Sequence, residues 1–529
     1  MAVAILRRKI NAESSLIYRL PPESLAMVAS HLDIDDLFTA AHVSSHWRAI
    51  LLSFPNLWSD IQYGNDEEML TMLQWSKSAP LHVSVEFGTP PEEVTNSLYN
   101  NSARIVSLKS DSRVVLRKLF AHPMTSLKTL SIDVDGLEVV DAPRDLADEP
   151  AGVVPSLRAL SVGGNIEGLG FCVPHLTHFK FHGWFSFGTD SEVLLSILGV
   201  FRQCPMLEVV DVGWGEELYH SENFVFSKGD VVSLPHLRYL AQEQYVRIDQ
   251  PWLPDLLHLP RLRSMRLKGP PIAYSPGGTN HLSPPFLYDK SPYLSDIRRV
   301  KLGTVYHHSD NVIETFMEIV NGQGILLSFR KTITLGEAVF KLDPWAIIED
   351  EINPPNLCAL RPVNTGSPMV LCLDRYNLRR GIRGSTHISQ GLEDLGNVTT
   401  LILSNSTVEP GLAALELEDE EEPQCHSTVH SLVIYSITPF LSAQSDIPQY
   451  LLRISRKRKI AGTPFRSVTL AICSAITVPP DDLAALNHYI ERFELLTGDD
   501  VLDWDVDKYF IPNYDPSQRR RDEHRFDAM

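Results

Sequence analysis

A six-residue pattern recurs along most of this chain and constrains its fold more than any other feature. The pattern has apolar residues at its first, fourth and sixth positions. Nine full copies occur, at Leu127–Leu130–Ile132, Leu157–Leu160–Val162, Leu176–Phe179–Phe181, Leu207–Val210–Val212, Leu262–Met265–Leu267, Ile297–Val300–Leu302, Val398–Leu401–Leu403, Val429–Leu432–Ile434 and Phe465–Val468–Leu470. Side chains two positions apart lie on the same face of a strand. Each copy therefore predicts a short strand that buries its fourth and sixth positions.

The spacing of the copies predicts a repeating unit. From Leu127 to Leu262 successive copies begin 19 to 31 residues apart, counting an incomplete copy at Leu237. Prolines two residues before a copy suit the entry to a strand, where no ladder donor is needed. They are Pro155, Pro174, Pro205, Pro235 and Pro260. An interval of this length holds one strand, one turn and one helix, which is the unit of a leucine-rich-repeat solenoid.

Segments with helical apolar spacing fall between the copies. They are Glu68–Ser76, Glu92–Ala103, Ser191–Cys204, Asp249–His258, Asn311–Asn321 and Asp481–Leu496. We therefore predict an α/β fold in which short parallel strands alternate with helices over residues 63–512, as an irregular leucine-rich-repeat solenoid. Insertions are expected at about 270–290, 322–394 and 409–428, and residues 513–529 are expected to be a disordered tail.

Two charge runs each allow two interpretations. The acidic run from Glu416 to Glu422 is either a solvated, mobile insertion or a contact for a basic client. The basic run from Arg453 to Lys459 is either a nuclear import signal or the charged end of a helix that starts near Ile447.

The N-terminal segment predicts a separate bundle of three short helices. Prolines suit its first helical turn, aspartates can cap the second helix, and Ser44 or Ser45 can cap the third. Its apolar residues recur at helical spacing. The residues that carry this pattern are Pro21, Pro22, Leu25, Val28, Ala29, Leu32, Asp33, Asp35, Leu37, Ala41, Trp47, Ile50, Leu51 and Pro55. A segment this short rarely buries enough surface alone, so we expect it to lend apolar residues to a partner.

This segment resembles the F-box, in the F-box-like form common in basidiomycete fungi, where irregular leucine-rich repeats follow it. The resemblance covers residues 16–62 and rests on Leu20-Pro21, Glu23, Leu25, Val28, Leu32, Asp36-Leu37, Val43, Trp47-Arg48 and Leu57-Trp58. The chain departs from the family at Ser44-Ser45-His46, where a cysteine is frequent, and at Met27-Val28, where the family has a bulkier pair.

The resemblance implies docking onto a Skp-type adaptor within a cullin-RING ubiquitin ligase. The repeats would then select a client protein, and the chain itself would need no cofactor and do no chemistry. The residues expected to form the bundle or face the adaptor are Leu20, Pro21, Leu25, Val28, Leu32, Leu37, Val43, Trp47 and Trp58. The alternative is a non-catalytic repeat scaffold whose helical segment only caps the solenoid, and such a cap would bury Leu20, Leu25 and Leu32.

The composition excludes several other classes of protein. A net charge of −19 argues against general binding to nucleic acid or anionic membranes. Six scattered cysteines without a CxxC pair indicate reduced thiols rather than a zinc site or disulfides. No apolar run approaches the roughly 18 residues of a membrane span. We therefore expect the protein in the cytoplasm, the nucleus or both.

A search for catalytic and metal-binding motifs finds no hydrolase, phosphate-loop or metalloprotease pattern. His42 and His46 lie four residues apart but have no further ligand beside them, so surface histidines are expected. An aromatic group that follows two of the predicted strands is a candidate client surface or a cap on the core. It consists of Trp184, Phe185, Phe187 and Trp214.

Overall fold

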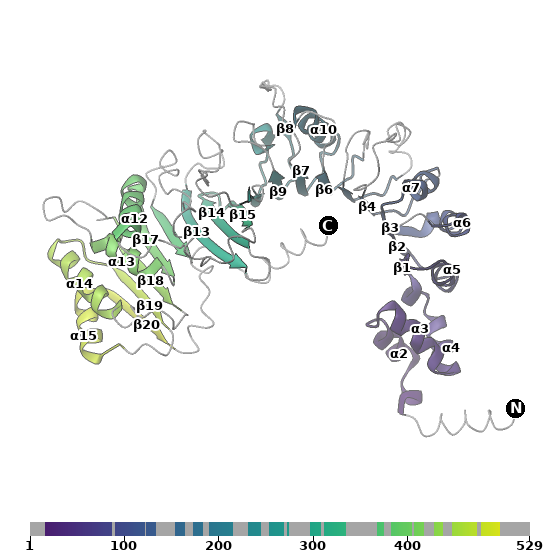
Figure 1. Cartoon of the computed structure of the whole chain (residues 1–529), viewed down its shortest axis with the longest axis horizontal. Coiled ribbons are helices and arrows are strands. Elements are labelled where there is room, and N and C mark those ends of the chain that lie inside the picture. The colour runs from purple at the N-terminus through teal and green to yellow at the C-terminus, as the bar shows by residue number, and fades with distance from the viewer. Residues whose placement is uncertain are drawn as a thin grey trace. The chain divides into compact units, whose positions relative to one another are not determined.

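Figure 1 shows the structure of the chain, a computed structural model. It describes residues 16–86, 90–121, 123–133, 154–163, 173–183, 190–214, 231–244, 253–268, 272–273, 297–307, 312–334, 368–374, 382–404, 407–416, 428–436, 447–472 and 478–497. The chain forms two compact units, Met1–Leu207 and Glu208–Met529, hereafter unit 1 and unit 2. Within the described ranges, no helix has both the length and the apolar character required to cross a bilayer.

Unit 1 begins with the predicted helical bundle. Its elements are η1 (Leu16–Arg19), α2 (Pro22–Ala29), α3 (Ile34–Val43), α4 (Ser45–Ser53) and η2 (Pro55–Trp58). Asp33 caps α3 by accepting a hydrogen bond from the Asp36 amide at 2.9 Å. Ser44 caps α4 by accepting one from the Trp47 amide at 3.2 Å. The three helices and their caps lie where the sequence predicts them.

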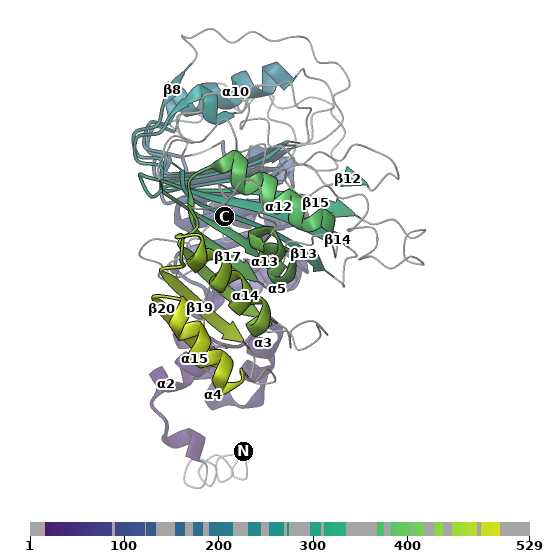
Figure 2. The same ribbon diagram turned by 90° about the vertical axis from the view of Figure 1, so that its left-hand side faces the viewer.

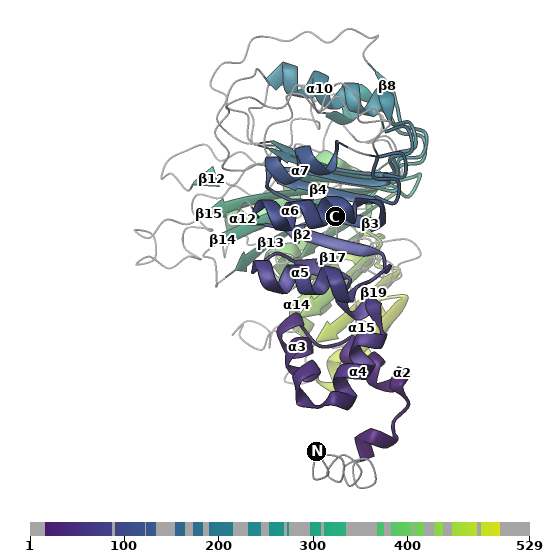
Figure 3. The ribbon, with the colours of Figure 1, turned by 90° about the vertical axis from the view of Figure 1, so that its right-hand side faces the viewer.

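A parallel sheet follows the bundle in unit 1. Its strands are β1 (Asp60–Gln62), β2 (Leu81–Val85), β3 (Ile105–Ser110), β4 (Thr129–Asp133), β5 (Ala159–Gly163) and β6 (His178–Gly183). Each strand pairs in parallel with the next one along the chain. The helical elements between and after them are α5 (Asp66–Trp75), α6 (Glu92–Asn100), η3 (Ser102–Arg104), α7 (Arg113–Leu119) and α10 (Asp190–Gln203). Figure 3 shows α5, α6 and α7 side by side on one face of the strands.

Unit 2 contains a longer sheet. Its strands lie in the spatial order β7 (Val209–Trp214), β9 (Tyr239–Gln244), β11 (Ser264–Lys268), β15 (Leu326–Thr334), β14 (Val312–Asn321), β13 (Ile297–His307), β16 (Met369–Asp374), β17 (Val398–Ser404), β18 (Ser431–Ser436), β19 (Ser467–Ile472) and β20 (Arg492–Thr497). All described pairs are parallel except the two made by β14. The strand β12 (Ile272–Ala273) pairs with the end of β15. The short strands β8 (Val232–Ser233) and β10 (Leu257–His258) pair with each other, and η5 (Leu253–Leu256) precedes β10.

Four helices lie on one face of the C-terminal part of this sheet, over β17 to β20. They are α12 (Ile382–Leu395), α13 (Val408–Glu416), α14 (Ile447–Ile460) and α15 (Pro480–Tyr489), and Figure 2 shows them side by side. The repeated pattern faces the helices in both units. Leu403 lies so close to Gly411 of α13 that a Cβ there would clash, and Phe179 packs edge-to-face on Phe201 of α10. Every apolar position of the nine full copies is at most 6% exposed.

The strand residues that alternate with the pattern form what we call the second face of each sheet. In unit 1 the second face carries small polar and charged residues that are exposed or half-buried, such as Thr129, Ser131 and Ser161. In unit 2 it carries a second apolar cluster between 0% and 8% exposed. The cluster consists of Val320, Cys372, Ile402, Val433, Tyr435 and Ala471. Unit 2 is therefore buried on both faces over β16 to β19.

Three of the predicted helices are wrong in whole or in part. Residues 311–321 were expected to be helical, but β14 occupies Val312–Asn321, antiparallel to β13 and β15. Its apolar pairs fit helical spacing, yet its β-branched and aromatic residues favour a strand once two neighbours offer a ladder. In the predicted helix at 481–496, α15 ends at Tyr489 and β20 follows. Of the helix expected at 249–258, the described part is η5 and β10.

Regular elements occupy parts of two segments in which the sequence predicts insertions. The strands β15 and β16 and the helix α12 fall within 322–394 or at its edge, and α13 fills the first part of 409–428. Leu412 and Leu415 of α13 are 1% exposed, so this helix belongs to the core. Most of the 270–290 insertion and all of the 513–529 tail lie outside the described residues.

Candidate functional site

The N-terminal bundle divides the predicted residues into a buried and an exposed set. Leu25, Leu37 and Trp58 are 2%, 3% and 0% exposed. The Trp58 indole Nε1 donates a hydrogen bond to the Leu51 carbonyl at 3.0 Å, which satisfies the one polar atom of that buried ring. Trp47 is only half-buried. The core tryptophan of the bundle is therefore Trp58.

The exposed apolar set of the bundle consists of Ile17, Leu20, Met27, Val28, Leu32 and Val43, which are between 36% and 67% exposed. These are six of the eleven large apolar side chains that the described residues expose. Pro21 is exposed as well. Isolated exposed apolar residues are normal, but such a concentration on one small bundle is typical of a surface that binds another protein. Sequence reasoning missed Ile17 and did not assign Met27 to this surface.

An aromatic joint connects the bundle to the sheet of unit 1. Phe38, Trp58 and Trp75 pack against one another with ring centroids 4.6 to 5.6 Å apart. Trp75 belongs to α5, the helix that follows β1, and Lys77 donates a hydrogen bond to the Leu52 carbonyl at 3.1 Å. The bundle thus packs on the first strand and helix of the sheet while Leu20 and Leu32 stay exposed. Sequence reasoning did not find this joint, because Trp75 is distant in sequence from Phe38.

His46 differs from the surface histidine that the sequence predicts. Its ring stacks on Tyr18 of η1 with centroids 4.2 Å apart and an interplanar angle of 14°. The Nε2 atom of His46 is buried and has no hydrogen-bond partner within the described ranges. His42 is exposed, as predicted. Among the residues that the structure describes, no group of acidic, histidine and cysteine side chains could hold a metal ion.

The basic run on α14 makes contacts within unit 2. Arg458 is 1% exposed, donates hydrogen bonds to the carbonyls of Val429 and Thr463 at 2.7 and 3.1 Å, and lies over the Phe465 ring. Lys459 donates to the His488 carbonyl at 2.6 Å. These contacts favour the interpretation as a helix end that anchors neighbouring elements.

The acidic run begins in contact with the basic run. The Glu416 carboxylate lies 2.6 Å from Arg453 Nε and 3.4 Å from Lys457 Nζ. Burial alone would raise the pKa of Glu416, but hydrogen bonds from Arg453 and Tyr450 and the charges of Arg453 and Lys457 hold that pKa below its usual value. Glu416 is thus part of the folded structure, while residues 417–422 lie outside the described residues.

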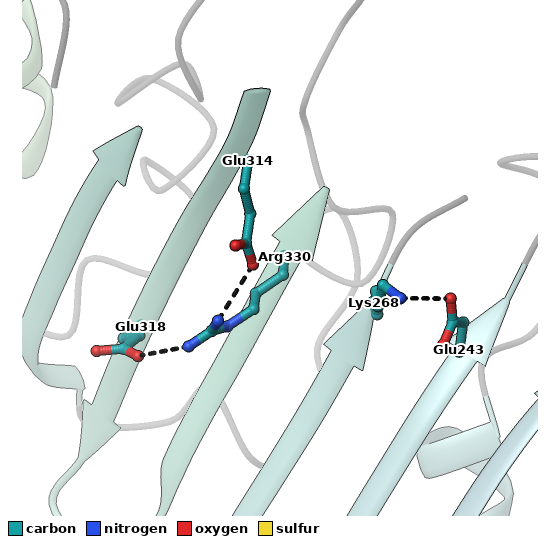
Figure 4. A network of polar contacts seen from close by, with 5 residues as sticks. All are labelled: Glu243, Lys268, Glu314, Glu318 and Arg330. Atoms are coloured by element: carbon teal, nitrogen blue, oxygen red, sulfur yellow. Dashed lines mark hydrogen bonds and ion pairs between the residues drawn. The ribbon is translucent and has the colours of Figure 1, made fainter. Parts of the chain in front are cut away.

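A polar network crosses the second face of unit 2 (Figure 4). Lys268 on β11 pairs with Glu243 on β9 at 2.7 Å, and Arg330 on β15 lies 3.1 Å from Glu314 and 4.0 Å from Glu318 on β14. Lys268 and Arg330 are directly opposite each other in the ladder. Like charges in that position repel, and the flanking carboxylates offset this repulsion. The network therefore stabilises the register in which antiparallel β14 joins a parallel sheet.

The side chains of the aromatic residues predicted as a client surface lie outside the described part of the structure. Trp184, Phe185 and Phe187 follow β6 but lie outside the described residues. Trp214 is the last residue of β7, and its side chain also lies outside them.

Comparison with known proteins bears on the bundle. Residues 17–62 match the family model described as F-box-like, and these limits nearly coincide with the predicted 16–62. No curated protein matches the chain significantly. The match supports an F-box protein. An F-box-like domain suggests, in general, an adaptor role in an SCF-type ubiquitin ligase and binding to a Skp-type adaptor.

Proposed function

We propose that this protein is a substrate-recognition adaptor of a cullin-RING, SCF-type ubiquitin ligase. The observation that carries the proposal is the exposed apolar set on the very bundle that matches the F-box-like family. A solvated bundle gains nothing from six large exposed apolar side chains, whereas a partner that covers them gains apolar burial. Ubiquitin transfer would take place on partner subunits, and the chain itself would do no chemistry.

Within the bundle we assign two roles by burial. Leu25, Leu37 and Trp58 form the core. The adaptor would contact the exposed predicted residues, which are Leu20, Pro21, Val28, Leu32 and Val43, together with Ile17 and Met27.

For the rest of the chain we propose an irregular solenoid of the leucine-rich-repeat type that binds a client protein. Two features support this: the strands of unit 1 pair in parallel in chain order, and the repeated apolar positions are buried in both units. A client surface at Trp184, Phe185, Phe187 and Trp214 stays a prediction.

The second candidate function is a scaffold in which the bundle only caps the sheet. The aromatic joint of Phe38, Trp58 and Trp75 favours it, because the joint packs the bundle on the first helix after β1. A cap, however, has no use for an exposed Leu20 and Leu32, which are 44% and 36% exposed.

Co-precipitation with a purified Skp-type adaptor and its cullin distinguishes the two functions. The full chain should capture both, and the double variant Val28→Asp/Val43→Asp should lose them. Val114→Asp is the matched control, because Val114 is 57% exposed on α7, outside the bundle. Capture that survives the double variant, or no capture by the wild type, would contradict the proposal.

A further inference from the structure

The first described turn of the chain depends on tertiary contacts for its position. The segment η1 has four residues, and helical segments this short are not stable by themselves in water. Two members of the exposed apolar set belong to it or follow it directly, Ile17 and Leu20, and they are 43% and 44% exposed. Tyr18, between them, is half-buried and stacks on His46 of α4.

His46 contributes to this contact through its ring face. The Nε2 atom is buried without a hydrogen-bond partner among the described residues, and a buried polar atom in that state destabilises the fold. An apolar ring would avoid this cost and keep the stacking contact. The partner of the ring is Tyr18, at a centroid distance of 4.2 Å and a nearly parallel angle.

Two hydrogen bonds anchor the helix that carries His46. Ser44 caps α4 through the Trp47 amide, so His46 lies in the first turn of a capped helix. Arg48 in the next turn donates a hydrogen bond to the Ala41 carbonyl of α3 at 3.0 Å. Because Tyr18 of η1 stacks on His46, this hydrogen bond links η1 to both α3 and α4.

We propose that the Tyr18–His46 stack is a positioning contact that holds Ile17 and Leu20 ready for the Skp-type adaptor. The inference rests on the proposed function and adds specific residues to it. It also gives a role to Ser44-Ser45-His46, the stretch in which this chain departs from the family pattern. His46 acts through η1, and the apolar side chains of η1 would touch the partner.

Calorimetric titration of the full chain with a purified Skp-type adaptor tests the proposal. His46→Ala should weaken binding by about three- to tenfold, the amount that a lost aromatic stack corresponds to. His46→Phe should bind within about twofold of the wild type, because it keeps the ring. The control His82→Ala, on β2 outside the bundle, should bind as the wild type does. Equal binding by His46→Ala and the wild type would overturn the proposal while leaving the proposed function intact.

Hydrogen exchange of the free protein provides a second test that needs no adaptor. Amides of residues 16–20 should exchange faster in His46→Ala and in Tyr18→Ala, and at the wild-type rate in His46→Phe. Unchanged exchange in both alanine variants would show that the stack does not hold η1. A wild-type chain that binds no adaptor would overturn the proposed function, whatever the exchange result.

Discussion

The two sheets bury the same repeated pattern on one face but differ on the other. On β4 and β5 of unit 1, the residues between the pattern positions are polar, namely Ser131 and Ser161, and both are half-buried. At the equivalent positions of β17 and β18 in unit 2, Ile402 and Val433 are 0% and 6% exposed. The repeated pattern thus determines one face only, and each unit uses the second face for a different purpose.

This difference indicates where a partner can bind. In the part of unit 1 that the structure describes, the second face is polar and exposed or half-buried. A Cβ on Gly163 would lie 2.7 Å from the Asp133 carboxylate, so a larger residue there would force that side chain to move. The second face of unit 2 over β16 to β19 is a second core, which excludes it as a free surface. Four comparisons between the two units give testable predictions, and the first of them tests this contrast directly.

The largest expected effect comes from placing a charge on the two second faces. Ile402→Asp would bury an unpaired carboxylate and should destabilise unit 2 by about 4 kcal/mol or more. The matched change Thr129→Asp, on the exposed second face of unit 1, should alter stability by less than about 0.5 kcal/mol. Urea denaturation of both variants measures the free energies. Similar losses of unfolding free energy in the two variants would mean that the second faces of the two units do not differ in burial.

The pattern face should respond alike in both units. Leu130→Ala and Leu401→Ala each truncate a side chain that is 0% exposed at the same pattern position. Each should cost about 2–5 kcal/mol, because a cavity remains in the core. Thermal unfolding followed by circular dichroism is the measurement. A small loss in one unit and a large loss in the other would mean that the pattern has different roles in the two sheets.

Replacing a buried and a half-buried arginine should cause a smaller loss of stability. The buried arginine should cost more than the half-buried one. Arg458 of unit 2 is 1% exposed, while Arg104 of unit 1 is half-buried and donates to the carbonyls of Ala79 and Leu73 at 2.8 and 3.0 Å. Arg458→Ala should cost about 2–3 kcal/mol and Arg104→Ala about 1–2 kcal/mol, because removal leaves carbonyl groups unpaired. Arg458→Lys should not restore the loss, since the guanidinium reaches the two carbonyls from two different nitrogens in a planar fork, which the single nitrogen of lysine does not reproduce. Denaturant titration of the three variants would detect a reversed order.

The smallest effect concerns pH. Burial opposes the shift, but hydrogen bonds from Arg453 and Tyr450 and neighbouring cations lower the pKa of Glu416 in unit 2. Hydrogen bonds from Ser84 and Lys109 lower the pKa of Glu86 in unit 1. A lowered carboxyl pKa stabilises the fold above the unfolded value near 4.3, and the contribution is lost as pH falls through the folded pKa.

Glu416→Gln should therefore cost about 1 kcal/mol at pH 7 and nothing once the pH is below the folded pKa. Glu86→Gln, at an exposed pair, should cost only a few tenths of a kcal/mol. Unfolding free energies measured from pH 7 down to pH 3 give both curves. If Glu416→Gln still had a lower free energy of unfolding than the wild type below the folded pKa, the ion pair could not be the cause.

The burial of unit 2 strands on both faces could be predicted in part from the sequence. The strands of unit 2 contain continuous apolar runs such as Leu401-Ile402-Leu403 and Leu432-Val433-Ile434, which are typical of strands buried on both faces. Unit 1 has Leu130-Ser131-Ile132, where polar residues alternate. The helix wrongly predicted at 311–321 could not be resolved in this way, because a strand between two partners depends on ladder bonds from distant residues.

The site was predictable in extent but not in detail. The three helices of the bundle follow from caps and helical spacing, and the limits of the segment follow from its resemblance to the F-box. Leu25 and Val28 belong to the same helical pattern, however, and only the packed structure separates the buried Leu25 from the exposed Val28. The contacts of Tyr18 with His46 and of Trp58 with Trp75 join residues that local patterns cannot connect.

Hydrogen-exchange mapping of the full chain, free and with a purified Skp-type adaptor, shows whether the exposed apolar set binds the adaptor. Exchange should become slower on binding in residues 17–43, which carry the exposed apolar set, and stay unchanged in β2 to β6 of unit 1. Protection confined to the second face of unit 1, or absence of protection in residues 17–43, would contradict this prediction.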